Sequence, residues 1–263
     1  MRPDMKIGIF YKNENKEINQ LIRQEIDRYG FTFDNKKPDV VFSIGGDGTF
    51  LRAIHEYLEQ LDSVRFIGIN NGSLGFLYDF AKEEIPDIFK KLSEGKLNEK
   101  EYPLLKGVAS YKESKDVIYA LNEIRIENPC HTLIADVFVN KDKLETYRGN
   151  GLIVSSSLGS SAYNKSLGGA LVDPDMFALE LTEVAGIQNN AYKSLGSSLI
   201  IKGDKVISFE GELTNSVVGY DYLNIQKGDY LEKIEISYSD KKVKIIYSED
   251  HSYIQRVRKS FVL

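Results

Sequence analysis

Apolar residues up to about position 100 follow two alternating patterns. Short apolar, β-branched runs at 6–11, 38–44 and 65–69 are typical of buried strands. In segments that follow such runs, apolar residues recur at helical spacing, and a glycine ends two of these segments, at Gly30 and Gly95. Repeated strand and helix units predict a mostly parallel sheet with helices on its faces, whose ligands bind beyond the carboxyl ends of the strands.

From about Glu101 the pattern changes to alternation of apolar and polar residues, which predicts antiparallel strands. Residues 155–191 interrupt this alternation. Their apolar positions from Phe177 to Ala185 fit helical spacing, so we expect a helix inserted into the β domain. The last residues combine apolar side chains with basic ones, which predicts a packed amphipathic segment.

These patterns predict two domains of different class. We expect an N-terminal Rossmann-like α/β domain at 1–100 and a larger antiparallel β-sandwich-like domain at 101–249. The tail at 250–263 is expected to pack back on the N-terminal domain. A length of 263 residues and a hydrophobic content of 42% suffice for a substantial core, so disorder is not expected.

The net charge and the cysteine content indicate which kind of partner and which cellular compartment to expect. The net charge is -5 and the basic residues are scattered, which argues against a nucleic-acid partner. The single cysteine, Cys130, excludes an internal disulfide and favours a reducing, cytoplasmic setting. No apolar run reaches the ~18 to 20 residues of a membrane span, so no membrane partner is expected. The expected partner is a small molecule.

A glycine loop, Gly45-Gly46-Asp47-Gly48-Thr49, lies between a predicted strand and a predicted helix. Glycines let the backbone approach a phosphate, and a helix N-terminus favours negative charge. Asp47 is unusual there, because an anion beside a phosphate must coordinate a metal ion, accept a proton from an attacking hydroxyl, or cap the helix. A cap needs no surrounding glycines, so the loop favours phosphoryl transfer with Mg2+.

Two further clusters have polar residues suited to a ligand. Asn122 and Glu123 interrupt an alternating strand and could bind a ribose or an amide, although an exposed pair at a strand end fits the pattern equally well. Glycines and small hydroxyls are dense at 148–151 and 155–170, where a ligand could lie against the backbone. A flexible linker is the alternative for that stretch.

Together, the motifs at 45–49, 122–123, 148–151 and 159–170 resemble those of the bacterial NAD kinases, and the resemblance runs nearly the whole length of the chain. The glycine loop alone is unspecific, since phosphofructokinases and diacylglycerol or sphingosine kinases have similar loops. The resemblance implies transfer of the ATP γ-phosphate to the 2′-hydroxyl of the adenosine ribose of NAD, giving NADP, with Mg2+ or another divalent cation. It also implies a homo-oligomer, either a dimer or a homotetramer.

The resemblance implies a role for each matching residue. Asp47 would be the general base that also contacts NAD, and Asp221 would approach the site of a neighbouring subunit. The residues that would hold phosphates are Gly45, Gly46, Gly48 and Thr49. The remaining residues that would contact NAD are Gly48, Asn122, Glu123, Arg148, Asn150, Ser161, Ala162, Tyr163, Asn164, Lys165, Ser166, Ala185 and Tyr192.

The chain departs from the family pattern near two of these motifs. Asn150 replaces an acidic residue, so a charge-assisted contact becomes a neutral one, weaker by about 1 to 2 kcal/mol at most. Leu158 lies where the family has a hydroxyl, and a proline is also lost there. Because Asp47 and the Asn122-Glu123 pair are intact, we expect an active enzyme. The alternatives are a dinucleotide-binding sensor without turnover and a lipid or sugar kinase sharing only the glycine loop.

Overall fold

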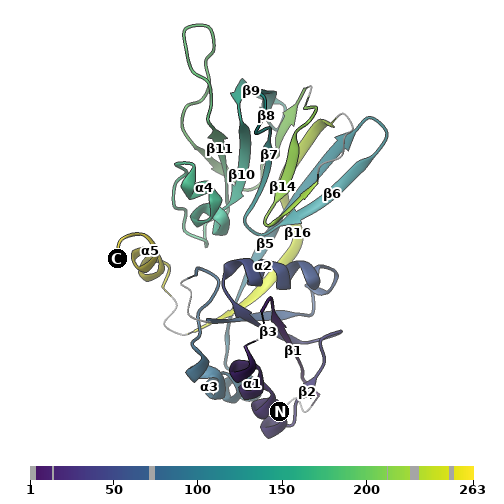
Figure 1. The fold of residues 1–263 in the computed structure, drawn as a ribbon, viewed down its shortest axis with the longest axis vertical. Coiled ribbons are helices and arrows are strands. Elements are labelled where there is room, and N and C mark those ends of the chain that lie inside the picture. The colour runs from purple at the N-terminus through teal and green to yellow at the C-terminus, as the bar shows by residue number, and fades with distance from the viewer. Residues whose placement is uncertain (1–3, 14, 71–74, 212, 226–230, 249–251) are drawn as a thin grey trace. The chain divides into compact units, whose positions relative to one another are not determined.

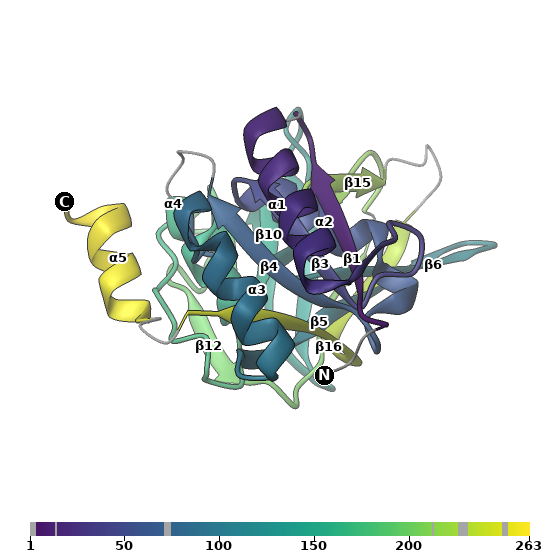
Figure 2. The same ribbon diagram turned by 90° about the horizontal axis from the view of Figure 1, so that it is seen from below.

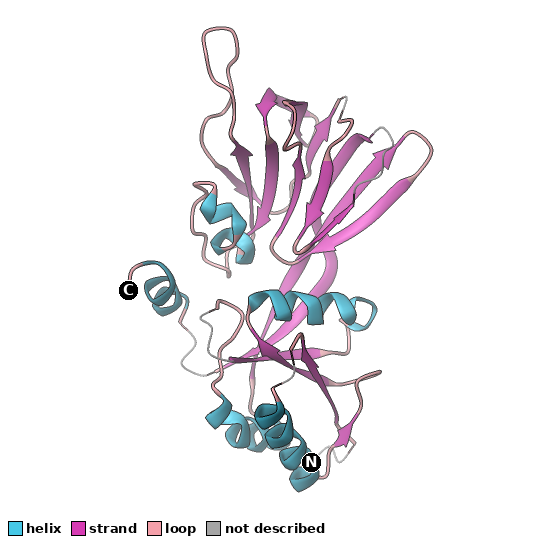
Figure 3. Ribbon diagram, in the orientation of Figure 1, coloured by secondary structure: helices cyan, strands magenta, loops and turns pink. Residues whose placement is uncertain are grey.

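The computed structural model describes residues 4–13, 15–70, 75–211, 213–225, 231–248 and 252–263. The chain forms two compact units, Met1–Tyr102 with Lys241–Leu263 (unit 1) and Pro103–Asp240 (unit 2). Figure 1 shows helices and strands in unit 1, and Figure 3 shows that strands predominate in unit 2. The predicted class, an α/β domain followed by an antiparallel β domain, is confirmed.

Unit 1 is built on a parallel sheet in the order β2-β1-β3-β4-β16. Its strands are β1 (Lys6–Tyr11), β2 (Thr32–Phe33), β3 (Val40–Gly45), β4 (Arg65–Asn70) and the C-terminal part of β16 (Leu231–Tyr247). Its α-helices are α1 (Lys16–Tyr29), α2 (Asp47–Glu56), α3 (Ile85–Glu94) and α5 (Tyr253–Phe261), and 3-10 turns lie at Leu58–Gln60 and Lys82–Glu84. Helices α1 and α3 cover one face of the sheet and α2 covers the other (Figures 1 and 2).

The ends of the helices in unit 1 follow from local chemistry. The Asn15 side chain accepts a hydrogen bond from the Ile18 N–H at 3.1 Å and caps the start of α1. Gly30 and Gly95 end α1 and α3 in the left-handed conformation, with φ of 67° and 68°. The predicted helix ends are therefore confirmed. Apolar faces of α1 and α3 pack on the sheet in one core.

Unit 2 contains antiparallel strands in two sheets. One sheet has six strands in the order β12-β11-β10-β7-β14-β15. In the other, neighbouring strands follow the order β16-β13-β8-β9, and β5 pairs with both β16 and β6. The bounds are β5 (Asn98–Tyr111), β6 (Lys115–Ala120), β7 (Glu123–Glu127), β8 (Leu133–Val139), β9 (Asp142–Gly149), β10 (Gly151–Ser156), β11 (Ala178–Val184), β12 (Leu199–Lys202), β13 (Ile207–Glu210), β14 (Val217–Tyr220) and β15 (Leu223–Ile225). A 3-10 turn lies at Leu158–Ser161, and helix α4 is Tyr163–Ser166.

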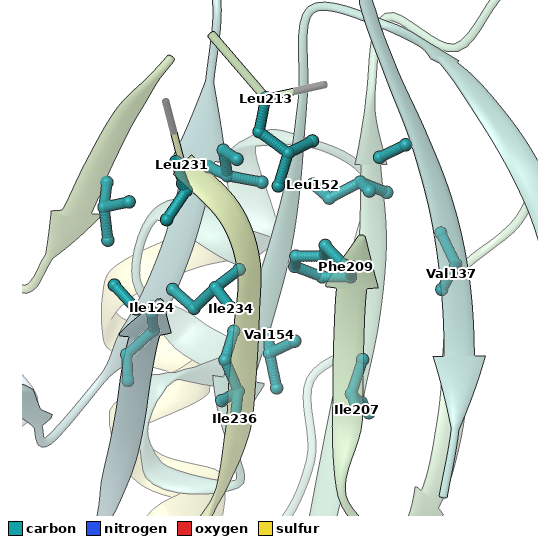
Figure 4. Packing of buried hydrophobic residues seen from close by; sticks show 14 of the residues in the cluster. Ile124, Val137, Leu152, Val154, Ile207, Phe209, Leu213, Leu231, Ile234 and Ile236 are labelled. Carbon is teal, nitrogen blue, oxygen red and sulfur yellow. The ribbon is translucent and has the colours of Figure 1, made fainter. Parts of the chain in front are cut away.

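The core of unit 2 lies between its sheets. Figure 4 shows Ile124, Leu152 and Val154 of the six-stranded sheet packed with Phe209 and Ile234 of the other. These side chains are fully buried, as alternation along each strand requires. The predicted sandwich-like arrangement is confirmed for this unit.

One predicted element is wrong. We expected a helix at 177–185, but this segment is strand β11, paired with β10 on one side and β12 on the other. A short run of apolar residues fits either period, and pairing with two neighbouring strands decides the outcome. The helical residues lie earlier, in the one-turn helix α4.

The C-terminal segment forms the predicted amphipathic element as helix α5, and its N-cap Ser252 accepts a hydrogen bond from the Gln255 N–H. This helix belongs to unit 1, as expected for the tail. Residues 241–248 also belong to unit 1, whereas we had expected them in the β domain, because this part of β16 pairs in parallel with β4. Among the described residues, no helix is long and apolar enough to cross a membrane.

Candidate active site

The residues predicted to carry chemistry fall in both units. In unit 1 the glycine loop connects β3 to α2, at the carboxyl end of a parallel strand. Gly45 has a φ of 152°, and a Cβ there would lie 2.7 Å from Thr49 Oγ1, so this position requires glycine. A Cβ at Gly48 would meet nothing within 4 Å, which leaves open space beside the helix N-terminus.

Asp47 is the first residue of α2, but its side chain does not cap that helix. Its Oδ2 accepts a hydrogen bond from the Phe76 N–H at 2.9 Å, and its Oδ1 accepts one from the Leu77 N–H at 3.0 Å. The capping alternative is therefore wrong. A carboxylate has about four lone-pair sites, so each oxygen of Asp47 can accept a further proton donor.

The surroundings of Asp47 shift the pKa of its carboxyl in opposite directions. Burial raises the pKa of its carboxyl, while the hydrogen bonds from Leu77 and Phe76 and the positive charge of Arg256 lower it. The net direction is upward. A carboxylate with a raised pKa is a stronger proton acceptor, as a general base requires.

In unit 2, Asn122 and Glu123 are buried, with 9% and 4% of their surfaces exposed. The alternative of an exposed pair at a strand end is therefore wrong. The Asp221 carboxylate accepts hydrogen bonds from the Leu121 N–H at 2.9 Å and the Asn122 N–H at 2.8 Å. The Asp221 N–H donates to the Glu123 carbonyl at 3.1 Å, so Asp221 holds the backbone of the pair within its own chain. Its expected approach to a neighbouring subunit stays a prediction.

The start of the small-residue segment packs directly on this pair. Ser156 Oγ donates to the Leu121 carbonyl at 2.6 Å, and the Ser156 N–H donates to the Asn122 carbonyl at 2.9 Å. A Cβ on Gly159 would overlap the Asn122 carbonyl oxygen, so only glycine fits there. Two motifs that are distant in sequence are therefore one cluster, and the alternative of a flexible linker is wrong. Leu158, a departure from the family pattern, is buried.

Glu123 is a buried acid with half of its carboxyl unpaired. Its Oε1 accepts from Arg125 Nη1 at 3.2 Å, whereas its Oε2 has no hydrogen-bond partner among the described residues. Burial, helped by the negative charge of Asp221 and opposed by Arg125, raises the pKa of Glu123 to about 8. The group is therefore protonated near neutral pH and can both donate and accept a hydrogen bond.

Arg125 is a candidate site residue that the sequence analysis missed, because it contacts both Glu123 and Tyr163. Its Nε donates to Glu127 at 2.9 Å, and its guanidinium lies 5.6 Å from the centre of the Tyr163 ring. Tyr163 in turn donates from its hydroxyl to Glu127 at 3.2 Å. Strand alternation places Glu123, Arg125 and Glu127 on one face of β7, and that spacing was the signal in the sequence.

The residues predicted to line an adenosine pocket differ in their accessibility. Tyr163 and Ser166 are exposed, and Ser161, Ala162 and Lys165 are partly exposed. Asn164 is fully buried instead, donating to Glu180 at 2.8 Å and accepting from Thr182 at 2.7 Å. Its side chain supports β11 and is not directed to solvent.

The other predicted residues lie near the ends of two strands: Arg148 at the end of β9, Asn150 just after it, and Ala185 and Tyr192 after β11. The Arg148 guanidinium lies 4.5 Å from the centre of the Tyr192 ring, and the Arg148 carbonyl accepts from the Ile187 N–H at 2.7 Å. Ala185, with a φ of 49°, is exposed, and a Cβ on Gly149 would lie 2.8 Å from its carbonyl oxygen. Asn150 is also exposed and donates from Nδ2 to the Asn128 carbonyl at 3.3 Å.

Comparison with known proteins places both units in one family. The model of the ATP-NAD kinase N-terminal domain matches residues 1–97, and that of the ATP-NAD kinase C-terminal domain matches residues 121–248. The chain belongs to the NAD kinase family. The match includes the second domain, whereas the alternative of a lipid or sugar kinase rested on the glycine loop alone.

Individual NAD kinases resemble this chain over almost its whole length. The NAD kinase of Limosilactobacillus reuteri subsp. reuteri is 37% identical over 267 residues, covering 98% of each chain. The NAD kinase of Streptococcus gordonii is 37% identical over 265 residues, covering 98% of this chain and 96% of the other.

Solved structures of NAD kinases share the fold. Yeast NADH kinase complexed with NADH has a TM-score of 0.85 at 18% identity, covering 99% of this chain and 88% of that one. The NAD kinase from Archaeoglobus fulgidus in complex with ATP has a TM-score of 0.78 at 22% identity, covering 98% and 97%. These likenesses support the two-domain fold of this family member.

Proposed function

We propose that this chain transfers the γ-phosphate of ATP to the 2′-hydroxyl of the adenosine ribose of NAD, giving NADP and ADP. The observation that carries the proposal is the match of both domains to the NAD kinase family. Relatives that are 37% identical over 98% of this chain bear the name NAD kinase.

Asp47 is the proposed general base. Its carboxylate takes the proton from the 2′-hydroxyl, the ribose oxygen attacks the γ-phosphorus, and the bond from that phosphorus to the bridging oxygen breaks, releasing ADP. Two features support this role: burial raises the pKa of Asp47, and two backbone N–H groups hold its oxygens in place. The same hydrogen bonds leave lone pairs for the hydroxyl.

Gly45, Gly46, Gly48 and Thr49 are proposed to hold the phosphates of ATP. The support is a glycine loop at the N-terminus of α2, where N–H groups without helical partners favour an anion. No cluster of three His, Cys, Asp or Glu side chains in the described part of the chain could bind a metal by itself. A divalent cation fits best as part of the ATP complex, where it would neutralise phosphate oxygens.

Residues of unit 2 are proposed to bind NAD. Asn122 and Glu123 would bind a ribose, supported by the unpaired Oε2 of Glu123 in a buried position. Tyr163, with Ser161, Ala162, Lys165 and Ser166, would line the adenosine pocket, since these residues are wholly or partly exposed. The base would lie near Ala185 and Tyr192, and Arg148 and Asn150 would also contact NAD. The support is that the Arg148 guanidinium lies 4.5 Å from the centre of the Tyr192 ring and that Asn150 and Ala185 are exposed.

The test is NADP formation by the purified chain with ATP, Mg2+ and NAD, measured with a dehydrogenase specific for NADP. Asp47→Asn should lower kcat by about 10²-fold or more, because a general base is lost. Calorimetry should still detect NAD binding to this variant. Wild-type protein that binds NAD tightly without making NADP would instead support the sensor, the alternative that the loss of a charge at Asn150 favours.

Assembly and compartment are part of the same proposal. We propose a homo-oligomer, a dimer or homotetramer, in the cytoplasm. An exposed free thiol at Cys130 fits a reducing compartment. Light scattering of the purified chain gives the mass of the assembly, and a monomer at micromolar concentration would contradict the first part.

A further inference from the structure

Asp47 is held by a short segment of backbone that lies outside its own helix. The N–H groups of Phe76 and Leu77 donate to its two carboxylate oxygens at 2.9 and 3.0 Å. The preceding Gly75 approaches the carboxylate so closely that a Cβ there would lie 2.5 Å from Oδ1. The position of the carboxylate therefore depends on the position of residues 75–77.

Arg256, from the C-terminal helix α5, holds this segment from the other side. Its Nη1 donates to the carbonyl oxygens of Phe76 at 2.6 Å, Tyr78 at 3.2 Å and Gly75 at 3.5 Å. Its Nη2 pairs with the Asp79 carboxylate. The Arg256 and Asp79 side chains are 11% and 9% exposed, so the contacts are shielded from water.

The peptide groups that contact Arg256 are the ones that contact Asp47. The carbonyl of Gly75 and the N–H of Phe76 belong to one peptide unit, and the carbonyl of Phe76 and the N–H of Leu77 belong to the next. Arg256 donates to the oxygen of each unit, and Asp47 accepts from the nitrogen of each. Hydrogen bonds in series polarise one another, so the cation strengthens the hydrogen bonds that fix the carboxylate.

Further contacts attach α5 to the same segment. Asp79 also accepts a hydrogen bond from the Ser248 N–H, just beyond β16, at 2.6 Å. The Phe76 ring packs against the rings of Tyr253 and Phe261 of α5, with centroids 6.3 and 5.6 Å apart. The helix therefore remains attached by apolar contacts when the guanidinium alone is changed.

We infer that Arg256 is a positioning residue for Asp47, acting through the two shared peptide groups. The inference rests on the proposed role of Asp47 as general base. An arginine is required, because its planar fork of donors can reach three carbonyl oxygens and a carboxylate at once, whereas a lysine is a single point charge. Tyr78 also interacts electrostatically with Asp47, and burial raises its pKa far above its ordinary value, so it stays neutral.

The kinetic test compares Arg256→Met, Arg256→Lys and, as a control, Arg258→Met, which alters an exposed cation of the same helix. Arg256→Met should lower kcat about 10- to 100-fold, the cost of misplacing a catalytic group. The KM for NAD should change less than about threefold, because no substrate contact is lost. The acid limb of the kcat profile should move to higher pH, since the positive charge that lowers the pKa of Asp47 is gone.

Arg256→Lys keeps the charge without the fork. It should therefore leave the acid limb in place and still lower kcat. If kcat and melting temperature fall together in both variants while the acid limb stays where it is, Arg256 has only a structural role and the inference is overturned. A kcat of Arg256→Met equal to that of Arg258→Met would also overturn it.

A spectroscopic test is independent of turnover. With 15N-labelled Phe and Leu, the amide signals of Phe76 and Leu77 should titrate with Asp47, and the midpoint should be higher in Arg256→Met than in the wild type. An unchanged midpoint would overturn the inference. Failure of the wild type to make NADP would instead contradict the proposed function, so the two failures are distinguishable.

Discussion

Replacing Glu123 by glutamine should flatten the pH dependence of stability near neutral pH. In the folded protein burial raises the pKa of this carboxyl from the ordinary 4.5 to about 8. The folded state therefore retains a proton that the unfolded chain releases at lower pH. This contribution to stability is fully present below about pH 4.5 and is lost as the pH rises through about 8.

The magnitude follows from that interval. Between 4.5 and about 8, at about 1.4 kcal/mol per pH unit, the free energy of unfolding should fall by about 5 kcal/mol on account of Glu123 alone. Glutamine has the same shape and its carbonyl can still accept from Arg125, so packing and this hydrogen bond are preserved. The variant should lose the pH-dependent contribution without a comparable loss of stability at low pH.

Urea unfolding at several pH values between about 5 and 8 gives the free energy of unfolding of each protein. The effect is the difference in this free energy between wild type and Glu123→Gln at each pH. This difference cancels the contributions of other acids such as Glu145 and Glu180, whose pKa values are also raised by burial. Glu232→Gln, at an exposed position on β16, is the control. If the free energy of unfolding depends on pH in the same way in wild type and Glu123→Gln, the reasoning is refuted.

Three more substitutions separate structural from functional roles. Gly48→Ala should keep or raise the free energy of unfolding in urea, by up to about 1 kcal/mol from helix propensity, yet reduce NADP formation, because its Cβ enters space open to a ligand. Full activity would contradict this. Gly159→Ala should lower the free energy of unfolding in urea by about 3 kcal/mol, because its Cβ overlaps the Asn122 carbonyl. It should also weaken NAD binding measured by calorimetry. Unchanged stability would contradict the packing of Gly159 on Asn122. Asp221→Ala leaves the N–H groups of Leu121 and Asn122 unpaired, so it should lower the free energy of unfolding in urea by about 2 to 5 kcal/mol. Asp221→Asn should lower it less, and equal losses in the two variants would contradict the assigned hydrogen bonds.

Much of unit 1 could be predicted because its signals are local. Strand β1 coincides with the apolar run at 6–11, and Gly30 and Gly95 end their helices, since only glycine adopts the left-handed conformation without strain. The strand at 178–184 could not be predicted in this way. Its apolar residues fit both periods, and the choice depended on hydrogen bonds to β10 and β12.

In the candidate site, too, local features could be predicted from the sequence, whereas contacts between distant segments could not. The sequence placed Asp47 at a strand-to-helix junction, and the structure has it there. The sequence could not show that the carboxylate accepts hydrogen bonds from the Phe76 and Leu77 N–H groups, because those contacts depend on where a distant segment lies. It could not show either that the Asn164 side chain is buried and hydrogen-bonded to Glu180 and Thr182; contact of this residue with NAD stays a prediction.

The sequence by itself determined most elements of unit 1, the class of the two domains and the residues that resemble those of the NAD kinases. Backbone preferences and hydrophobic periodicity act over a few residues, so they can be read along the chain. Only the tertiary structure decided which polar groups meet: Asp221 with the Asn122 backbone, and Arg256 with the peptide groups that hold Asp47. Hydrogen bonds between distant segments form only after burial has brought them together, and no local pattern records them.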